Sequence, residues 1–119
     1  MARFTLNTLE NIIAERAAVT DGSSYTATLI SCGIEKCAQK MGEEAIEAAI
    51  AAAVRDRVEL TREAADLLYH LLVVLKASNI SLKAVMAELD RRTSQTGIEE
   101  KASRPAVVKG KSAKKTSLK

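Results

Sequence analysis

Apolar residues recur every three or four positions along most of the chain, and this is the spacing of one face of an α-helix. The pattern first predicts an amphipathic helix over residues 6–18. At its start, Asn7 and Glu10 resemble a capping box, in which two side chains satisfy backbone N–H groups of the first turn. No run of alternating apolar and polar residues predicts a strand, so we expect an all-α protein.

A polar loop over residues 20–24 follows, and Ser23 or Ser24 can cap a short helix that ends near Gly33. Helical spacing then resumes and predicts a long helix, which ends before a break at residues 55–57, Arg-Asp-Arg. The apolar face of this helix is formed by Ile34, Cys37, Ala38, Met41, Ala45, Ala48, Ala49 and Ala52.

A second long helix is predicted over residues 58–77. Beyond Glu63 it is apolar nearly all round, so we expect it at the buried centre of a bundle. Asn79 and Ser81 end this helix and cap a third major helix over residues 82–93.

The composition indicates how such a bundle is held together. The chain of 119 residues suffices for one domain, and 47% of its residues are hydrophobic. It contains two Tyr, one Phe and no Trp, so the core must be built from Ala, Leu, Ile and Val. Such a core favours a helical bundle that is completed by dimerisation. We assign residues 1–105 to an all-α domain. Residues 106–119 form a basic tail that we expect to be disordered, because its composition cannot bury enough apolar area.

The charge is unevenly distributed between these two parts. The formal net charge is +3, but residues 105–119 contain five lysines and no acid, which leaves 13 basic and 15 acidic residues in the body. The high isoelectric point is therefore a property of the tail, and no nucleic-acid partner is expected for the folded domain. An acidic body that binds phosphates would need a metal ion.

Cysteine and histidine are too scarce for a zinc site. Cys32, Cys37 and His70 are the only such residues, and the cysteine spacing is not that of a redox C-x-x-C motif. No N-terminal signal is evident, and the most apolar stretch, residues 64–75, is shorter than the roughly 20 residues needed to span a bilayer. We therefore expect a cytoplasmic protein with reduced thiols and no membrane association.

Two acidic pairs with the same spacing carry the candidate chemistry: Glu44 with Glu47, and Glu63 with Asp66. Residues three apart share a helix face, so each pair can direct two carboxylates to one point, and antiparallel helices can merge the two points. Four hard oxygen donors suit Mg²⁺, or alternatively Mn²⁺. Acidic residues are also common on solvated helix faces, so the spacing alone does not decide between a metal site and a surface.

The surroundings of Asp66 favour the metal site. Asp66 lies within a long apolar run, where a lone ionised carboxylate would cost several kcal/mol unless it is paired or bound to metal. Two structural alternatives remain open. Lys36, Lys40 and Glu44 can form a surface ladder of ion pairs, and a network with Lys or Arg can balance the acids. His70 can orient a ligand, but a core histidine bonded to Asp66 is favoured.

Four linked segments carry a family resemblance. Residues 24–27 (SYTA), 39–47 (QKMGEEAIE), 63–72 (EAADLLYHLL) and 97–104 (GIEEKASR) closely resemble the phosphoribosyl-ATP pyrophosphatase family of histidine biosynthesis. The resemblance covers about residues 5–105, and Met41 and the lysine tail depart from it. It implies a MazG-like, all-α, dimeric hydrolase that cleaves the α–β phosphoanhydride of phosphoribosyl-ATP to give phosphoribosyl-AMP and pyrophosphate. It also implies the stand-alone form, without a fused cyclohydrolase domain.

The resemblance also implies roles for individual residues. Glu44, Glu47, Glu63 and Asp66 would hold Mg²⁺, and Glu43 would be a further ligand or the base that orients water. Phosphate charge would be neutralised by Lys40, Lys101 and Arg104. Three readings compete with this one: a related pyrophosphatase with another nucleoside triphosphate as substrate, a dimeric helical scaffold without catalysis, and a basic-tailed nucleic-acid binder.

Overall fold

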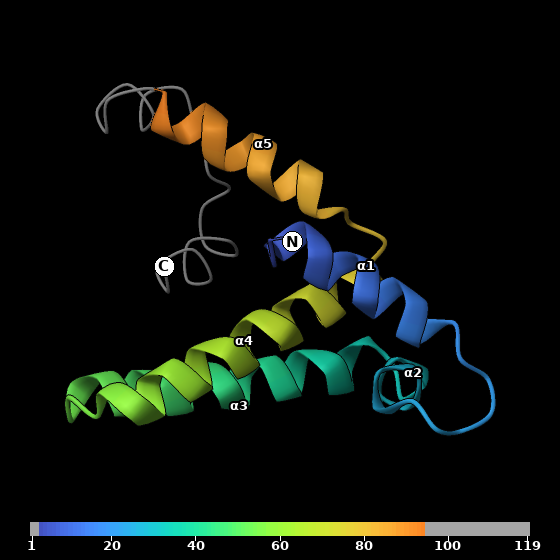
Figure 1. The fold of residues 1–119 in the computed structure, drawn as a ribbon, viewed down its shortest axis with the longest axis horizontal. Coiled ribbons are helices and arrows are strands. Elements are labelled where there is room, and N and C mark those ends of the chain that lie inside the picture. The colour runs from blue at the N-terminus through green and yellow to red at the C-terminus, as the bar shows by residue number, and fades with distance from the viewer. Residues whose placement is uncertain (1–2, 95–119) are drawn as a thin grey trace, which may run out of the picture. The chain divides into compact units, whose positions relative to one another are not determined.

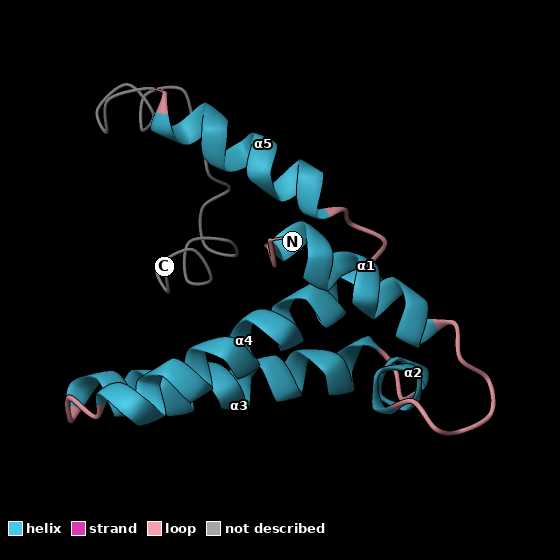
Figure 2. Cartoon of the chain, viewed as in Figure 1, coloured by secondary structure: helices cyan, strands magenta, loops and turns pink. Residues whose placement is uncertain are grey.

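The structure is a computed structural model that describes residues 3–94, and within this range it contains helices and loops but no strand (Figure 2). The all-α class expected from the sequence is confirmed. The chain divides into two compact units, residues 1–85 and 86–119. Its helices are α1 (Leu6–Ala17), α2 (Tyr25–Ser31), α3 (Ile34–Ala53), α4 (Arg57–Ala77) and α5 (Leu82–Thr93) (Figure 1).

The N-terminus of α1 is capped differently from the sequence-based prediction. Thr5 and Thr8 form the capping box: the Thr5 hydroxyl accepts the Thr8 N–H at 3.1 Å, and the Thr8 hydroxyl accepts the Thr5 N–H at 3.2 Å. The prediction of Asn7 and Glu10 is therefore wrong, because the helix begins at Leu6 and places Asn7 inside its first turn. Glu10 instead accepts the N–H of Leu82 through Oε2 at 2.8 Å and so ties α1 to the start of α5.

Helix α2 is short and tightly bounded. Of the two candidate caps, Ser24 is the one used, since its hydroxyl accepts the N–H of Ala27 at 3.1 Å and donates to the carbonyl of Arg16 at 2.7 Å. Ser23 bonds to the Asp21 carboxylate instead. Gly33 joins α2 to α3 at a φ of +103°, a region that L side chains rarely adopt.

Helices α3 and α4 form an antiparallel pair and lie side by side over most of their length (Figure 1). The predicted break between them is confirmed. Arg55 adopts a left-handed conformation with φ at +61°, and the N–H of Asp56 reaches back to the carbonyl of Ala51 at 3.0 Å, as in a Schellman motif. Asp56 then caps α4 by accepting the N–H of Glu59 at 3.0 Å.

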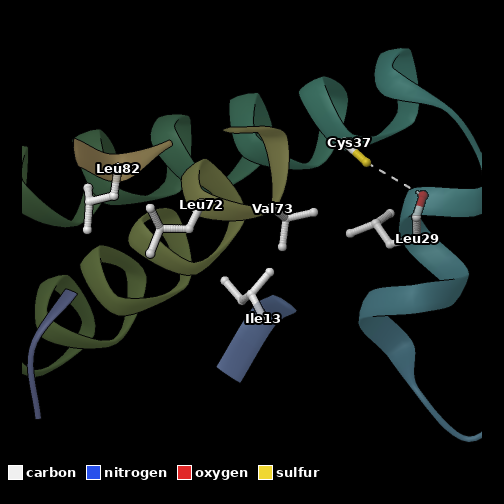
Figure 3. Packing of buried hydrophobic residues seen from close by; sticks show 6 residues of the cluster. All are labelled: Ile13, Leu29, Cys37, Leu72, Val73 and Leu82. Atoms are coloured by element: carbon white, nitrogen blue, oxygen red, sulfur yellow. Dashed lines mark hydrogen bonds between the residues drawn. The ribbon is translucent and has the colours of Figure 1, made fainter. Parts of the chain in front are cut away.

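The core of the first unit is small and aliphatic, as the composition predicts. Every helix contributes to it, and the buried cluster comprises Ile13, Leu29, Cys37, Leu72, Val73 and Leu82 (Figure 3). The Cys37 thiol donates to the carbonyl of Leu29 at 3.5 Å, and burial raises the pKa of that thiol. The core therefore fixes the C-terminal half of α4 against α1, α2 and α3.

Helix α4 is not buried all round, which corrects the expectation that it forms the centre of the bundle. Within the described chain it packs mainly against α3 and less extensively against α1 and α2. Beyond Glu63, the stretch to which the expectation applies, Leu68 is 41% exposed. An apolar run in sequence does not show on which side neighbouring helices pack, and here they leave one side of α4 open.

In the second unit, the described residues 86–94 belong mainly to α5. Glu88 accepts from Arg91 at 2.8 Å and from Arg92 at 2.9 Å, and these two partners lower the pKa of Glu88 to about 2. Across residues 3–94, no single helix is long and apolar enough to cross a membrane, and α4 and α5 meet those limits only together, as a bent pair.

Candidate active site

The two acidic pairs face each other across the α3–α4 hairpin. Carboxylate oxygens of Glu44 on α3 and of Glu63 and Asp66 on α4 all lie within 4.8 Å of one another. The structure thus brings together three of the four carboxylates that were predicted to converge. Such oxygens are the ligands that Mg²⁺ and Mn²⁺ prefer.

Glu63 is the buried member of this cluster and is only 8% exposed. Its Oε1 is enclosed and has no hydrogen-bond partner within the described chain. The adjacent Glu59 carboxylate, burial, and the Glu44 and Glu47 carboxylates raise the pKa of Glu63 to about 8. A buried oxygen without a donor, among carboxylates that repel it, lacks a positive partner.

Asp66 does not occupy the environment expected for it. Its side chain is exposed, so the argument that apolar surroundings would make its charge costly is wrong for this chain. The apolar neighbours of Asp66 in sequence turn toward other sides of α4, while Asp66 faces the hairpin groove with Glu63. The carboxylate that burial destabilises is Glu63.

Glu47 and Glu43 are both outside the cluster of three carboxylates and have different neighbours. Glu47 is exposed and lies outside the set of three, but it is close enough to help raise the pKa of Glu63. Glu43 instead accepts from Gln39 at 2.9 Å and from Lys40 at 3.3 Å, and these two neighbours lower its pKa. In the described residues Lys40 pairs with Glu43, and not with Glu44 as in the alternative of a surface ladder.

Glu59 is a further carboxylate beside the cluster that was not predicted from the sequence. It lies one turn before Glu63 and is half-buried. Together with Glu47, Asp56 and Glu63 it lines a pocket of about 330 Å³ beside the cluster. The i,i+4 spacing of Glu59 and Glu63 was visible in the sequence, but Glu59 also fits the first turn of a helix, where acids are common.

His70 borders the site from the C-terminal side of α4. It is 7% exposed, its Nδ1 has no partner, and no hydrogen bond joins it to Asp66 in the described structure, so the favoured bond between these residues is not found. Its ring stands edge-on to Tyr69 at 4.9 Å and to Tyr25 at 6.4 Å. Burial lowers the pKa of His70.

The donor set fits a hard divalent cation. It offers several carboxylate oxygens on two helices and one enclosed oxygen that no group of residues 3–94 satisfies. Lysine supplies positive charge at one edge through Lys40. Lys101, Arg104 and the tail of residues 106–119 lie outside the described residues.

Comparison with known proteins identifies the family. The family model described as phosphoribosyl-ATP pyrophosphohydrolase matches residues 6–93. The chain belongs to this family. It is 58% identical over 105 residues to the phosphoribosyl-ATP pyrophosphatase of Agrobacterium fabrum, which covers 88% of this chain and 98% of the relative. It is also 58% identical over 104 residues to the proteins of that name from Rhizobium johnstonii and Methylobacterium nodulans, covering 87% of this chain and 97% of each relative.

The match to the phosphoribosyl-ATP pyrophosphohydrolase family includes the whole α3–α4 hairpin. Glu44, Glu63 and Asp66, with their neighbours Glu47 and Glu59, therefore lie inside the segment that defines the family. The family resemblance noted in the sequence is thus confirmed.

Proposed function

We infer that this protein hydrolyses phosphoribosyl-ATP at its α–β phosphoanhydride and releases phosphoribosyl-AMP and pyrophosphate, a step of histidine biosynthesis. Family membership and the names of the close relatives support this activity. The observation that carries the inference for this chain is Glu63, a buried carboxylate whose Oε1 has no partner in the described part of the chain and whose neighbours are acids. Such an arrangement suits a protein that recruits a cation together with an anionic substrate.

The proposed cofactor is Mg²⁺, with Mn²⁺ as the alternative, held by Glu44, Glu47, Glu63 and Asp66. The convergence of Glu44, Glu63 and Asp66 within 4.8 Å supports the assignment. Glu47 is proposed as the fourth ligand because its carboxylate is close enough to help raise the pKa of Glu63. When bound, the ion would screen the polyphosphate and lower the pKa of a bound water. Glu63 would lose its proton on binding, because a carboxylate ligand must be ionised.

The remaining residues would act directly on water and phosphate. Glu43 is proposed as a further ligand or as the base that orients the attacking water, and the hydrogen bonds from Gln39 and Lys40 lower its pKa and so favour its ionised form. Lys40 lies at the edge of the cluster, where it can neutralise developing charge on a phosphate oxygen. Lys101 and Arg104 are proposed to do the same from beyond the described residues.

We further propose that the protein is a homodimer in the cytoplasm. Ile46, Ile50 and Val54 form an exposed apolar stripe on α3, with 58% to 67% of each residue accessible, which a second copy would cover. Cys32 and Cys37 are free thiols, which suits a reducing compartment.

A substrate screen tests the proposed function. Pyrophosphate release is measured with phosphoribosyl-ATP and, at equal concentration, with ATP, GTP, CTP and UTP. We expect kcat/KM for phosphoribosyl-ATP to exceed each of the others by at least about 10². Preference for a common nucleoside triphosphate would support the related-pyrophosphatase alternative, and no turnover of any of them with Mg²⁺ or Mn²⁺ would support the scaffold.

A further inference from the structure

A second hollow lies at the junction of α1 and α2, with a volume of about 570 Å³. Arg16 from the last turn of α1 and Tyr25 from the start of α2 line it, together with Tyr69 from α4. This volume falls in the range of small-molecule pockets. The hollow is separate from the acidic pocket, and nothing in the metal chemistry proposed above uses it.

Most polar groups of this hollow are already satisfied within the fold. The Ser24 hydroxyl is shared between the N–H of Ala27 and the carbonyl of Arg16, and the Thr26 hydroxyl bonds to that of Tyr69. Within residues 3–94, the Arg16 guanidinium and the Tyr25 hydroxyl make no hydrogen bond or ion pair, and Tyr25 is 55% exposed. These two groups remain available to a ligand, one as a cation and the other as a hydroxyl.

Tyr25 links the hollow to the carboxylate cluster. Its ring stands at 87° to that of His70, which follows Asp66 by one helical turn. Tyr25 also lies near enough to Lys40 to contribute to the raised pKa of that lysine, after the larger effect of Glu43. A ligand whose phosphates lie at Lys40 and the cluster can therefore extend past Tyr25 into the hollow.

We propose that the α1–α2 hollow is the specificity subsite for the phosphoribosyl group, in which Arg16 binds its 5′-phosphate and the Tyr25 hydroxyl bonds to the same group. This inference rests on the proposed function and adds to it the residues that select the substrate.

The chemistry of the substrate explains why such a subsite is needed. Phosphoribosyl-ATP is anionic at two ends, because the phosphoribosyl group carries a phosphate in addition to the triphosphate. The cluster with its cation serves only the triphosphate end. Discrimination against ATP requires a second positive group at a distance from the cluster, and a guanidinium is well suited to phosphate.

The test compares two inhibitors that differ only in the group in question. Inhibition constants of phosphoribosyl-AMP and of AMP are measured for the Mg²⁺-loaded wild type and for Arg16→Gln. We expect the wild type to bind phosphoribosyl-AMP more tightly than AMP. In Arg16→Gln this ratio should fall by roughly tenfold, through loss of phosphoribosyl-AMP affinity alone. Arg16→Lys should retain part of the preference.

Arg3→Gln is the matched control, since it removes the same charge from an exposed arginine just before α1 and should leave the ratio unchanged. Tyr25→Phe should lower the ratio without changing the melting temperature, which covers the case in which Arg16→Gln does not fold. An unchanged ratio in Tyr25→Phe and, if it folds, in Arg16→Gln, or an equal loss for both inhibitors, would overturn the subsite. Failure of the wild type to hydrolyse phosphoribosyl-ATP would instead overturn the proposed function, so the two failures are distinguishable.

Discussion

At the scale of single residues, Glu63 has the most informative environment in the described chain. It is buried beside four other carboxylates, those of Glu44, Glu47, Glu59 and Asp66, and its Oε1 has no donor among the described residues. The neighbouring carboxylates and burial both favour the neutral form of Glu63. In the metal-free protein its carboxyl group is therefore protonated at the place where a cation is proposed to bind. This coupling between proton and metal can be measured without substrate.

We expect the metal-free protein to lose stability as the pH rises from about 5 to about 8. The folded-state pKa of Glu63, about 8, lies above its ordinary value of 4.5. The stabilising contribution of its proton is therefore complete below 4.5 and disappears as the pH rises through about 8. Melting temperatures in chelator-treated buffer should show this slope in the wild type and a flatter one in Glu63→Gln.

Glu88→Gln is the control for this experiment. The pKa of Glu88 is lowered to about 2 by Arg91 and Arg92, so its contribution is lost only as the pH falls from 4.5 toward 2. It should leave the slope between pH 5 and pH 8 unchanged. Equal slopes in the wild type and Glu63→Gln would contradict the described environment of Glu63.

The sequence could identify the carboxylates of the site but not their environments. Helical spacing placed Glu44, Glu63 and Asp66 on facing sides of two helices, and the structure brings them together. Spacing carries no information on which side of α4 is covered, so the burial attributed to Asp66 belongs to Glu63. Glu59 was overlooked for a different reason, because an acid in the first turn of a helix is common whatever its function.

At the scale of elements, the α3–α4 hairpin holds the site, and its turn sets how the two helices meet. Arg55 sits at the turn in a left-handed conformation, which a side chain disfavours. The sequence predicted the break here from Arg-Asp-Arg, but no glycine marked the residue that takes this conformation. The capping box at Thr5 was likewise missed, because the first turn holds several polar residues that compete for the role.

We predict that Arg55→Gly raises the free energy of unfolding by ~0.5–1 kcal/mol, because glycine adopts a positive φ without strain. Arg62→Gly is the matched control. Arg62 lies within α4 and is exposed, so the same change there should lower stability by ~1 kcal/mol. Chemical denaturation of both variants measures the two values, and a loss in both would show that the turn does not strain Arg55.

At the scale of the whole molecule, the apolar surface of the first unit is larger than one chain covers. The core contains only a few fully buried side chains, while the stripe of Ile46, Ile50 and Val54 stays exposed. The scarcity of aromatic residues predicted that one chain would form only a small core. The covering partner could not be located from the sequence, because an exposed stripe and a buried one have the same helical spacing.

Light scattering at micromolar concentration should give twice the chain mass of 12.8 kDa. Ile50→Glu should reduce it to the mass of one chain, because a charge in the centre of the stripe would be buried on association. Ile34→Glu, on the same helix but off the stripe, should stay dimeric. A wild-type mass of one chain would refute the dimer.

Removal of residues 106–119 should leave the melting temperature and turnover of phosphoribosyl-ATP nearly unchanged. The removed segment lies beyond the family match, which ends at residue 93, and its sequence has no apolar periodicity. Steady-state kinetics of the truncated protein provide the measurement. A loss of more than about tenfold in kcat/KM would show that the tail contributes to the site.

The central claim is that the carboxylate cluster of the hairpin holds a divalent cation for pyrophosphate release. The most direct measurement is pyrophosphate release from phosphoribosyl-ATP against Mg²⁺ concentration, for the wild type, Asp66→Asn, Glu44→Gln and, as control, Asp90→Asn on α5. We expect losses of roughly 10²–10⁴ in kcat/KM for the two cluster variants, with helical content retained, and none for the control. Wild-type turnover in Asp66→Asn and Glu44→Gln, or undiminished stabilisation of both by Mg²⁺, would contradict the account.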